Sequence, residues 1–203
     1  MIVIIDYGLG NLRSVQCALR RIGAESTITS DAGEASAADG VILPGVGAFW
    51  RAMENLRKLG LAEVVLESVR NGKPLLGICL GMQLLFSESE EHGRHEGLGI
   101  IPGKVKRFTE SLKIPHMGWN EVRQQNPSPL LIGVKDEAFF YFAHSYYVAP
   151  DEPAAVIGLT DYGKTFASVV RKDNVFGTQF HPERSGPEGL EMLKNFYRLC
   201  QTK

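Results

Sequence analysis

The chain has 203 residues, of which 44% are hydrophobic and 22% are charged, close to the averages of globular proteins. A chain of this length buries about 70% of the surface that its unfolded form exposes, so a full hydrophobic core is available. The 22 Lys and Arg against 23 Asp and Glu leave a net charge of −1, and this balance argues against nucleic-acid binding through a basic surface.

The sequence carries no targeting or membrane signal that we recognise. Residues 1–8 lack the basic region and the cleavage site of a signal peptide. The longest apolar segment, 74–86, is too short to cross a membrane. Three cysteines form an odd set without zinc-type spacing. We therefore expect a soluble cytoplasmic protein of a reducing compartment, without a metal or cofactor, that binds neither membranes nor nucleic acid.

Short apolar runs alternate with helical patterns in the first half of the chain. The patterns predict strands at 1–6, 25–29, 41–43 and 74–78, and helices at 12–22, 61–69 and 80–86. Such alternation is typical of a parallel sheet with helices on both faces. We predict an α/β fold with a mostly parallel, doubly wound sheet.

The second half has a different pattern, because short β-like segments follow one another without intervening helices. They lie at 104–108, 139–142, 146–148, 155–159, 166–171 and 175–180. A final helical stripe runs from Leu190 to Tyr197. We expect antiparallel or mixed strands added to the same core, within a single domain over residues 1–203.

The strongest local signal is a cysteine between two glycines, Gly77-Ile78-Cys79-Leu80-Gly81, at the end of an apolar strand. This is the nucleophile-elbow pattern with Cys in place of Ser. The turn would place the sulfur at the positive end of the following helix and leave the amide of Leu80 facing a developing oxyanion. A small apolar cysteine with packing glycines is the structural alternative.

A nucleophilic cysteine needs a base, and the base needs a partner that orients it. His181-Pro182-Glu183 follows the last predicted strand. In an extended segment, residues two apart project to the same side, so Glu183 could bind one imidazole nitrogen and leave the other for Cys79. Taken without Cys79, this tripeptide would more often be a turn with a solvated acid.

Two further patterns bear on the site. Pro44-Gly45-Val46-Gly47 closes the strand at 41–43, where its amides could approach a ligand. Gly8-Leu9-Gly10 begins like a dinucleotide fingerprint, but Arg13 replaces the third glycine and we reject that interpretation. His144, at a strand end, is expected to be a structural histidine.

The cysteine elbow, the Pro-Gly-x-Gly turn and the His-Pro-Glu tripeptide together resemble class I glutamine amidotransferases over essentially the whole chain. Within that family, residues 79–86 and especially Pro-His-Met-Gly-Trp-Asn at 115–120 are similar to the glutaminase subunits of imidazole glycerol phosphate synthases. The resemblance implies a type 1 glutamine amidotransferase domain of α/β fold.

The resemblance also implies a mechanism and roles for individual residues. Glutamine would be hydrolysed to glutamate and ammonia through a triad of Cys79, His181 and Glu183. The remaining roles are oxyanion contacts from the amides of Leu80 and of the turn at Val46 and Gly47, and substrate contacts from Gln83, Glu91 and Ser145.

The implied partner is a (β/α)₈-barrel cyclase subunit that uses the ammonia in histidine biosynthesis and yields imidazole glycerol phosphate and AICAR. The positions that resemble the subunit contact are Asn11, Trp119, Asn120, Tyr141 and Arg184. Arg184 departs from the family pattern His-Pro-Glu-Lys-Ser, and a planar guanidinium is not equivalent to an ammonium group.

Two alternatives remain open at this stage. The chain could be the glutaminase of another synthase, such as pyridoxal phosphate synthase, which should lack the segment at 115–120. It could also be a catalytically silent regulatory subunit, although such a subunit has no need of Cys79, His181 and Glu183 together.

Overall fold

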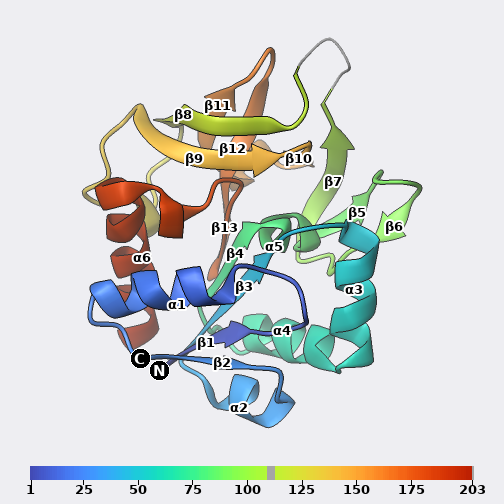
Figure 1. Ribbon diagram of the computed structural model, residues 1–203, viewed down its shortest axis with the longest axis vertical. Helices are drawn as coiled ribbons and strands as arrows, with labels where there is room; N and C mark the ends of the chain where they lie inside the picture. Colours follow the sequence, from blue (N-terminus) through green and yellow to red (C-terminus); the bar gives the residue numbers. More distant parts are fainter. Residues whose placement is uncertain (109–112, 203) are drawn as a thin grey trace.

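The computed structural model describes residues 1–108 and 113–202, and one large twisted sheet runs through the molecule (Figure 1). Its strands are β1 (Ile2–Ile5), β2 (Ser26–Thr29), β3 (Gly40–Gly45), β4 (Leu75–Cys79), β5 (Phe86–Ser89), β6 (His95–Glu96), β7 (Ile101–Arg107), β8 (His116–Gln124), β9 (Ala138–His144), β10 (Tyr146–Pro150), β11 (Val156–Asp161), β12 (Thr165–Lys172) and β13 (Val175–Thr178).

The helices belong mostly to the first half and to the carboxyl end of the chain. The α-helices are α1 (Leu12–Arg21), α2 (Ala32–Ala37), α3 (Phe49–Lys58), α4 (Leu61–Arg70), α5 (Leu80–Leu84) and α6 (Gly186–Gln201). Three short 3₁₀ helices are η1 (Pro129–Leu131), η2 (Pro153–Ala155) and η3 (Pro182–Arg184).

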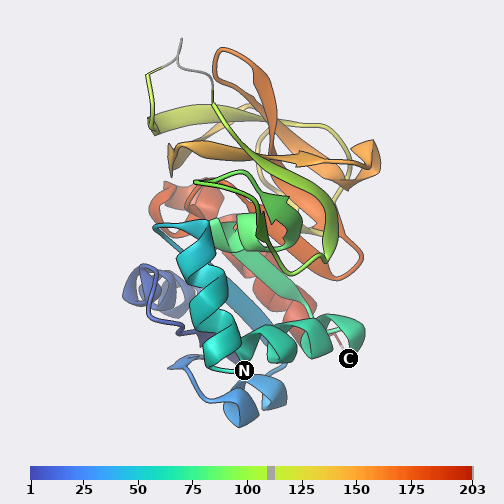
Figure 2. The same cartoon turned by 90° about the vertical axis from the view of Figure 1, so that its right-hand side faces the viewer.

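The sheet has a parallel half and an antiparallel half. Parallel pairing joins the strands in the order β2-β1-β3-β4-β13. Antiparallel pairing continues from β13 through β12 and β10 to β7, while β11, β8 and β9 branch from β12. Figures 1 and 2 both show the antiparallel strands above the helix-covered parallel half. The predicted α/β fold class is thereby confirmed.

Alternation along the buried strands explains why helices cover both faces of the parallel half. In β1, Ile2 and Ile4 belong to one core cluster, and Val3 and Ile5 belong to the other. The first cluster includes the apolar faces of α1 and α6, and the second includes those of α2, α3 and α4. A strand that is apolar on both sides is stable only when both sides are covered.

The structure departs from the sequence predictions in several places, three of which bear on the site. The predicted helix 80–86 ends at Leu84, and Phe86 begins β5 instead. The sequence patterns did not indicate helix α3 or strand β8. Of these, β8 matters most here, because it contains most of the segment 115–120.

Candidate active site

Cys79 lies at a sharp turn between β4 and α5. Its backbone has φ 55° and ψ −110°, a conformation that is strained for a residue with a side chain. The residue is 5% exposed. The predicted elbow is therefore present, although α5 is only five residues long.

Gly77 and Gly81, on either side of Cys79, lie so close to neighbouring backbone atoms that neither position has room for a side chain. A Cβ on Gly81 would lie 1.7 Å from the Leu43 carbonyl oxygen. A Cβ on Gly77 would lie 2.7 Å from the Gly81 carbonyl oxygen. Since real contacts of this kind do not come below about 3 Å, any side chain here would separate α5 from β3 and β4. The turn that presents Cys79 thus depends on both glycines.

His181 lies directly behind Cys79 and is held by Glu183. The imidazole Nδ1 is 2.9 Å from Glu183 Oε1, and the side chains of the pair are 4% and 1% exposed. Cys79 is near enough to His181 to raise the pKa of the imidazole. The three residues predicted from sequence are therefore brought together in the predicted order.

The electrostatics of this cluster favour a protonated imidazole. Burial by itself would lower the pKa of His181, but the hydrogen bonds and negative charges of Cys79 and Glu183 outweigh it and raise the pKa to about 10. A charged imidazole with Nδ1 occupied by a carboxylate can donate only from its other nitrogen, which faces Cys79. The arrangement can therefore deliver a proton at the sulfur side of the ring.

The local conformation of the His-Pro-Glu tripeptide differs from the extended one that we predicted. Residues 182–184 form the 3₁₀ helix η3, so the prediction of an extended segment is wrong although the contact itself is present. Ser185 fixes this turn, because its hydroxyl donates to the His181 carbonyl oxygen at 2.6 Å and accepts from the Tyr141 N–H at 3.0 Å. The Tyr141 carbonyl oxygen in turn accepts from the His181 N–H at 2.9 Å.

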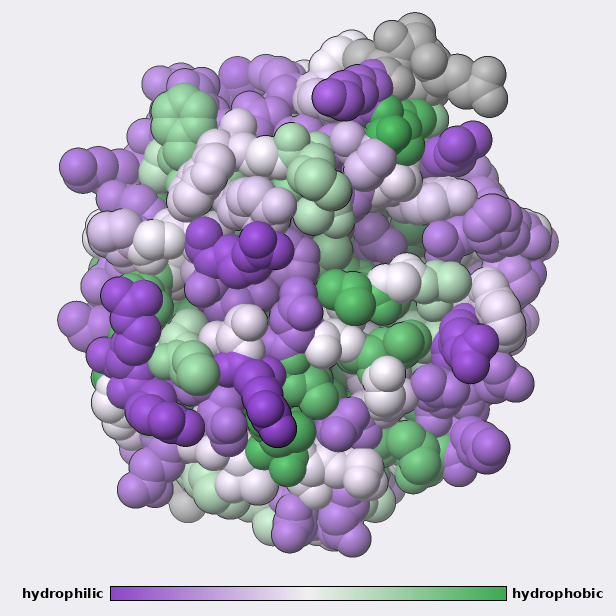
Figure 3. Space-filling model, in the orientation of Figure 1, coloured by the Kyte–Doolittle hydropathy of each residue, from purple (hydrophilic) through white to green (hydrophobic). Residues whose placement is uncertain are grey.

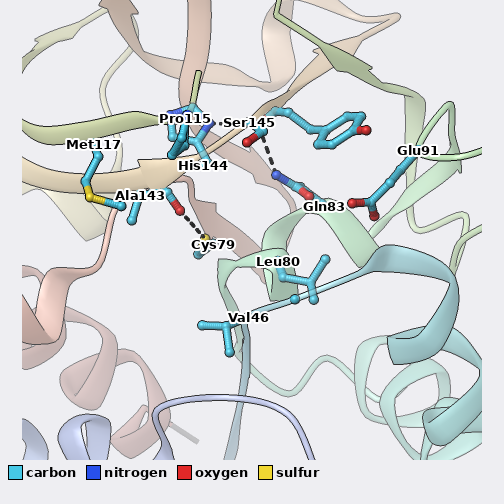
Figure 4. A pocket seen from close by; sticks show the side chains of 12 residues that line it. Val46, Cys79, Leu80, Gln83, Glu91, Pro115, Met117, Ala143, His144 and Ser145 are labelled. Carbon is cyan, nitrogen blue, oxygen red and sulfur yellow. Dashed lines mark hydrogen bonds between the residues drawn. The ribbon is translucent and has the colours of Figure 1, made fainter. Parts of the chain in front are cut away.

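A cavity of about 210 Å³ opens in front of the Cys79 sulfur (Figure 4). It is lined by Val46, Gly47, Cys79, Leu80, Gln83, Glu91, Pro115, Met117, Ala143, His144, Ser145 and Tyr146. Its lining includes every residue that we predicted for the oxyanion and substrate contacts. The residues come from both halves of the sheet, so the cavity lies at their junction. Its size suits a molecule no larger than an amino acid.

Two polar side chains in the cavity have defined partners. Gln83 Nε2 donates to the Tyr146 carbonyl oxygen and to Gln179 Oε1, both at 3.1 Å. Glu91 Oε2 accepts from the Phe49 N–H at the start of α3. Gln179 was not predicted from sequence, yet it is fully buried and its Nε2 lies 3.7 Å from Cys79 Sγ.

The turn that ends β3 also reaches this cavity. Val46 and Gly47 are exposed at its mouth, and Gly47 has φ +97°, which favours glycine. Tyr7, 1% exposed, donates its hydroxyl to the Pro44 carbonyl oxygen at 2.7 Å and so supports the turn. A Cβ on Gly45 would meet this hydroxyl at 2.3 Å.

An exposed apolar surface lies beside the cavity, on β8, β9 and η3. Trp119 is 56% exposed and contacts Tyr141 on the neighbouring strand at a ring distance of 6.2 Å. The Arg184 guanidinium lies 4.2 Å from the centre of the Tyr141 ring. Met117, on the same face of β8, is 65% exposed and also lines the cavity. On the face of the molecule seen in Figure 3, hydrophobic side chains lie at and below the centre among polar ones.

The other two residues of the predicted subunit contact are placed differently. Asn120 follows Trp119 on β8 and therefore points to the opposite side, where its Nδ2 lies 3.2 Å from His116 Nε2 and 3.0 Å from the Asp161 carbonyl oxygen. Asn11 is exposed at the first turn of α1. The structure thus groups Trp119, Tyr141 and Arg184 and leaves Asn120 turned inward.

Within the described residues, no His, Cys, Asp or Glu cluster of three or more is arranged to hold a metal ion. In the same part of the chain, none of the helices is both long enough and apolar enough to span a membrane.

An α/β sheet with a cysteine elbow, a His–Glu pair behind it and a small cavity in front defines a glutamine amidotransferase of the triad type. The family model "Glutamine amidotransferase class-I" matches residues 3–200, and the chain belongs to this family. A solved structure described as a glutamine amidotransferase superposes with a TM-score of 0.79 at 20% identity, covering 100% of both chains. The PurLQS structure from Thermotoga maritima superposes with a TM-score of 0.72 at 20% identity and covers 97% of both chains.

Sequence relatives narrow the similarity to one subfamily. The imidazole glycerol phosphate synthase subunit HisH of Bacillus cereus (strain G9842) is 56% identical over 202 residues, covering 99% of this chain and 96% of that protein. The subunit of the same name from Moorella thermoacetica is 55% identical over 98% of this chain and 95% of its own length. The subunit of the same name from Desulfitobacterium hafniense (strain DSM 10664 / DCB-2) is 54% identical over 97% of this chain and 93% of its own length. These relatives agree with the resemblance carried by residues 79–86 and 115–120.

Proposed function

We propose that this chain is the glutaminase subunit of an imidazole glycerol phosphate synthase and that it hydrolyses glutamine to glutamate and ammonia. The observation that carries the proposal is the contact between the strained Cys79 and the His181–Glu183 pair at the floor of a cavity of amino-acid size. The relatives named above, at 54–56% identity, supply the choice of synthase.

The first chemical step forms a thioester. Cys79 Sγ attacks the side-chain amide carbon of glutamine, and the carbonyl electron pair moves to the oxygen. The amides of Leu80 and of the turn at Val46 and Gly47 stabilise this oxyanion. When it collapses, the carbon–nitrogen bond breaks and the nitrogen takes a proton from His181 to leave as ammonia. Glu183 keeps the imidazole in orientation throughout.

The second step releases glutamate. His181, now neutral, removes a proton from a water molecule, and the oxygen of this water attacks the thioester carbon. The second oxyanion collapses, the carbon–sulfur bond breaks and Cys79 is regenerated. The imidazole regains a proton in the step, which returns the site to its starting state. Each of the three residues is therefore required once in each half of the reaction.

Substrate recognition uses the acceptors at the far side of the cavity from Cys79. Glu91 supplies a carboxylate for the ammonium group of glutamine, and Gln83 lies beside it. Ser145 lines the same cavity on the antiparallel half, where its backbone faces the substrate. These three residues hold the amino-acid end while the amide end reaches the sulfur.

The ammonia is used by a partner, a (β/α)₈-barrel cyclase subunit. Free ammonia is protonated in neutral water, so a synthase that consumes it gains from a closed path between subunits. The exposed surface formed by Met117, Trp119 and Tyr141, with the Arg184 guanidinium over the Tyr141 ring, adjoins the cavity and suits this contact, since patches of large exposed apolar residues mark interaction sites. Asn11 joins this set by the sequence resemblance, whereas the Asn120 amide faces the other side of β8.

Glutamate release from glutamine tests the proposal. The purified chain is measured alone and with a barrel cyclase subunit and its ribotide substrate, as wild type and as Cys79→Ala. We expect strong stimulation by the partner that disappears in Cys79→Ala. Activity that is absent throughout, or that survives in Cys79→Ala, would overturn the proposal. Stimulation by the synthase subunit of pyridoxal phosphate synthase instead would identify the other glutaminase that the sequence left open.

A further inference from the structure

A buried run of hydrogen bonds joins strand β8 to the glutamine cavity. His116 Nδ1 lies 2.9 Å from His144 Nε2, and His144 Nδ1 lies 2.7 Å from the Tyr146 carbonyl oxygen. The same oxygen accepts from Gln83 Nε2 at 3.1 Å (Figure 4). Both histidines are almost completely buried. None of these bonds is used by the triad.

The Tyr146 carbonyl fixes the direction of every bond on the histidine side. A carbonyl oxygen only accepts, so His144 Nδ1 carries the hydrogen. In the neutral ring His144 Nε2 is then an acceptor, and His116 Nδ1 donates to it. His116 Nε2 accepts in its turn from Asn120 Nδ2 at 3.2 Å. If both rings are neutral, each therefore carries its hydrogen on Nδ1.

The surroundings keep both rings neutral. Burial lowers the pKa of His116 to about 4, and burial is also the largest cause that lowers the pKa of His144 to about 3. The rings of Phe142 and Tyr162 stack on His116 at centre distances of 4.8 and 4.1 Å. A second proton on His144 would set its Nε2–H against the His116 Nδ1–H. A second proton on His116 would set its Nε2–H against the Asn120 amide N–H.

The same carbonyl also fixes the orientation of Gln83. Because the carbonyl accepts, the nitrogen of the Gln83 amide faces it, and the second hydrogen of this nitrogen goes to Gln179 Oε1 at 3.1 Å. The remaining polar atom, Gln83 Oε1, lies on the side of Glu91 (Figure 4). A reversed amide would present a donor to the ammonium group of the substrate and repel it.

We propose that His116 and His144 are positioning residues of the glutamine site, which hold the Tyr146 carbonyl so that Gln83 presents its oxygen to the substrate's ammonium group. This inference rests on the proposed function for the identity of the substrate. His116 is the more informative of the two, because the cavity lining among the described residues includes His144 but not His116. His116 itself is therefore outside the cavity, and the substitutions below separate its hydrogen bonds from its ring packing.

The tautomers provide the direct test and need no ligand. Nitrogen-15 NMR of the histidine side chains at pH 7 should show His116 and His144 neutral, each with its hydrogen on Nδ1. The exposed His92 serves as the reference for a solvated ring. A hydrogen on Nε2 of either buried ring, or a charged ring, would overturn the proposal.

Glutamine binding provides the functional test, measured by calorimetry on the Cys79→Ala protein. Adding His116→Phe keeps a stacked ring and removes the hydrogen bonds, and we expect the dissociation constant to rise about 10-fold. His116→Asn, which restores a donor near Nδ1, should recover part of the affinity, and His92→Phe should change nothing. In a Gln83→Leu background the effect of His116→Phe should disappear.

Unchanged affinity in a folded His116→Phe protein would overturn the proposal. Should this variant fail to fold, the tautomers and the His116→Asn protein still decide it. Absence of glutamine binding to Cys79→Ala by itself would count against the proposed function, while the tautomers measured by NMR would still decide the role of the two histidines.

Discussion

The parallel and antiparallel halves of the sheet contribute to the site by different means. The parallel half provides backbone geometry, since Cys79 has a strained φ of 55° and the neighbouring glycines allow contacts that no side chain permits. The antiparallel half provides side chains, namely the buried histidines on one side of β8 and β9 and the exposed Trp119 and Met117 on the other. The parallel half thus positions the reacting cysteine. The antiparallel half orients the groups that bind the substrate and provides the exposed surface beside the cavity.

The largest effect is expected where the parallel half meets the triad. His181→Gln removes the proton donor that we assign to the leaving ammonia, and glutamine hydrolysis in the stimulated complex should fall on the order of 10⁴-fold. His92→Gln, an exposed histidine, is the matched control and should leave the rate unchanged. Retention of more than a tenth of the rate in His181→Gln would remove this residue from the mechanism.

The next largest effect is a loss of stability when the backbone packing of the parallel half is disturbed. Gly81→Ala places a Cβ 1.7 Å from the Leu43 carbonyl oxygen, so we expect the free energy of unfolding to fall by at least about 3 kcal/mol. Gly72→Ala has a positive φ of +74°, unlike Gly81, but its Cβ meets no atom within 4 Å, and the substitution should cost only about 1 kcal/mol. Urea denaturation of the two variants compares them directly, and equal losses would contradict the steric explanation.

The exposed side of the antiparallel half should affect only partner binding. Trp119→Ala removes a large apolar anchor, and affinity for the cyclase subunit should weaken about 30-fold, or about 2 kcal/mol. Ile132→Ala, which removes a side chain of similar exposure between η1 and β9, is the control. Glutamine binding to the Cys79→Ala protein should stay the same in both. Equal effects of the two substitutions on partner affinity would mean that this surface is not the interface.

The two halves should also lose stability at opposite ends of the pH scale. The pKa of His181 is raised from 6.5 to about 10, so its contribution is complete below pH 6.5 and is lost as the pH rises toward 10. The pKa values of His116 and His144 are lowered to about 4 and 3, so their neutral burial destabilises the fold increasingly as the pH falls below 6.5.

Urea midpoints measured against pH separate these contributions. Between pH 6.5 and 4, His116→Phe should reduce the acid-side slope of the unfolding free energy by about 1.4 kcal/mol per pH unit, because one group no longer takes up a proton on unfolding. Above pH 7 the variant and the wild type should lose stability in parallel. Identical acid slopes would show that His116 is charged in the folded protein.

The smallest effect concerns the departure from the family pattern at Arg184. Arg184→Lys replaces a planar cation over the Tyr141 ring, and the free energy of unfolding should decrease by about 0.5 kcal/mol. Arg123→Lys, on the exposed part of β8, is the control and should have no measurable effect. A larger loss in the control would mean that the stacked geometry contributes nothing.

The sequence was informative where local rules determine the structure. The elbow at Cys79 could be predicted because glycine at 77 and 81 indicates close backbone approach, and the parallel strands because they are apolar on both faces. Helix α3 could have been found from Phe49, Ala52 and Leu56, whose spacing is helical.

Strand β8 and Gln179 were harder to predict for physical reasons. In β8 the exposed residues Met117 and Trp119 are apolar, while the buried His116 is polar, which inverts the alternation used to recognise a strand. Gln179 carries no motif of its own, and its importance comes only from contacts with Gln83 and Cys79, which are about a hundred positions away in sequence.

The acceptor shared by His144 and Gln83 belongs to the main chain, and no codon change can delete it. Mutation can replace the hydrogen-bonding side chains at positions 83, 116 and 144, but the Tyr146 carbonyl oxygen is present whichever amino acid stands at position 146. Amino-acid changes at this site can therefore alter only the side chains that bind this carbonyl oxygen. Only chemical synthesis reaches that atom: an amide-to-ester exchange between residues 146 and 147 would weaken this oxygen as an acceptor while leaving every side chain unchanged.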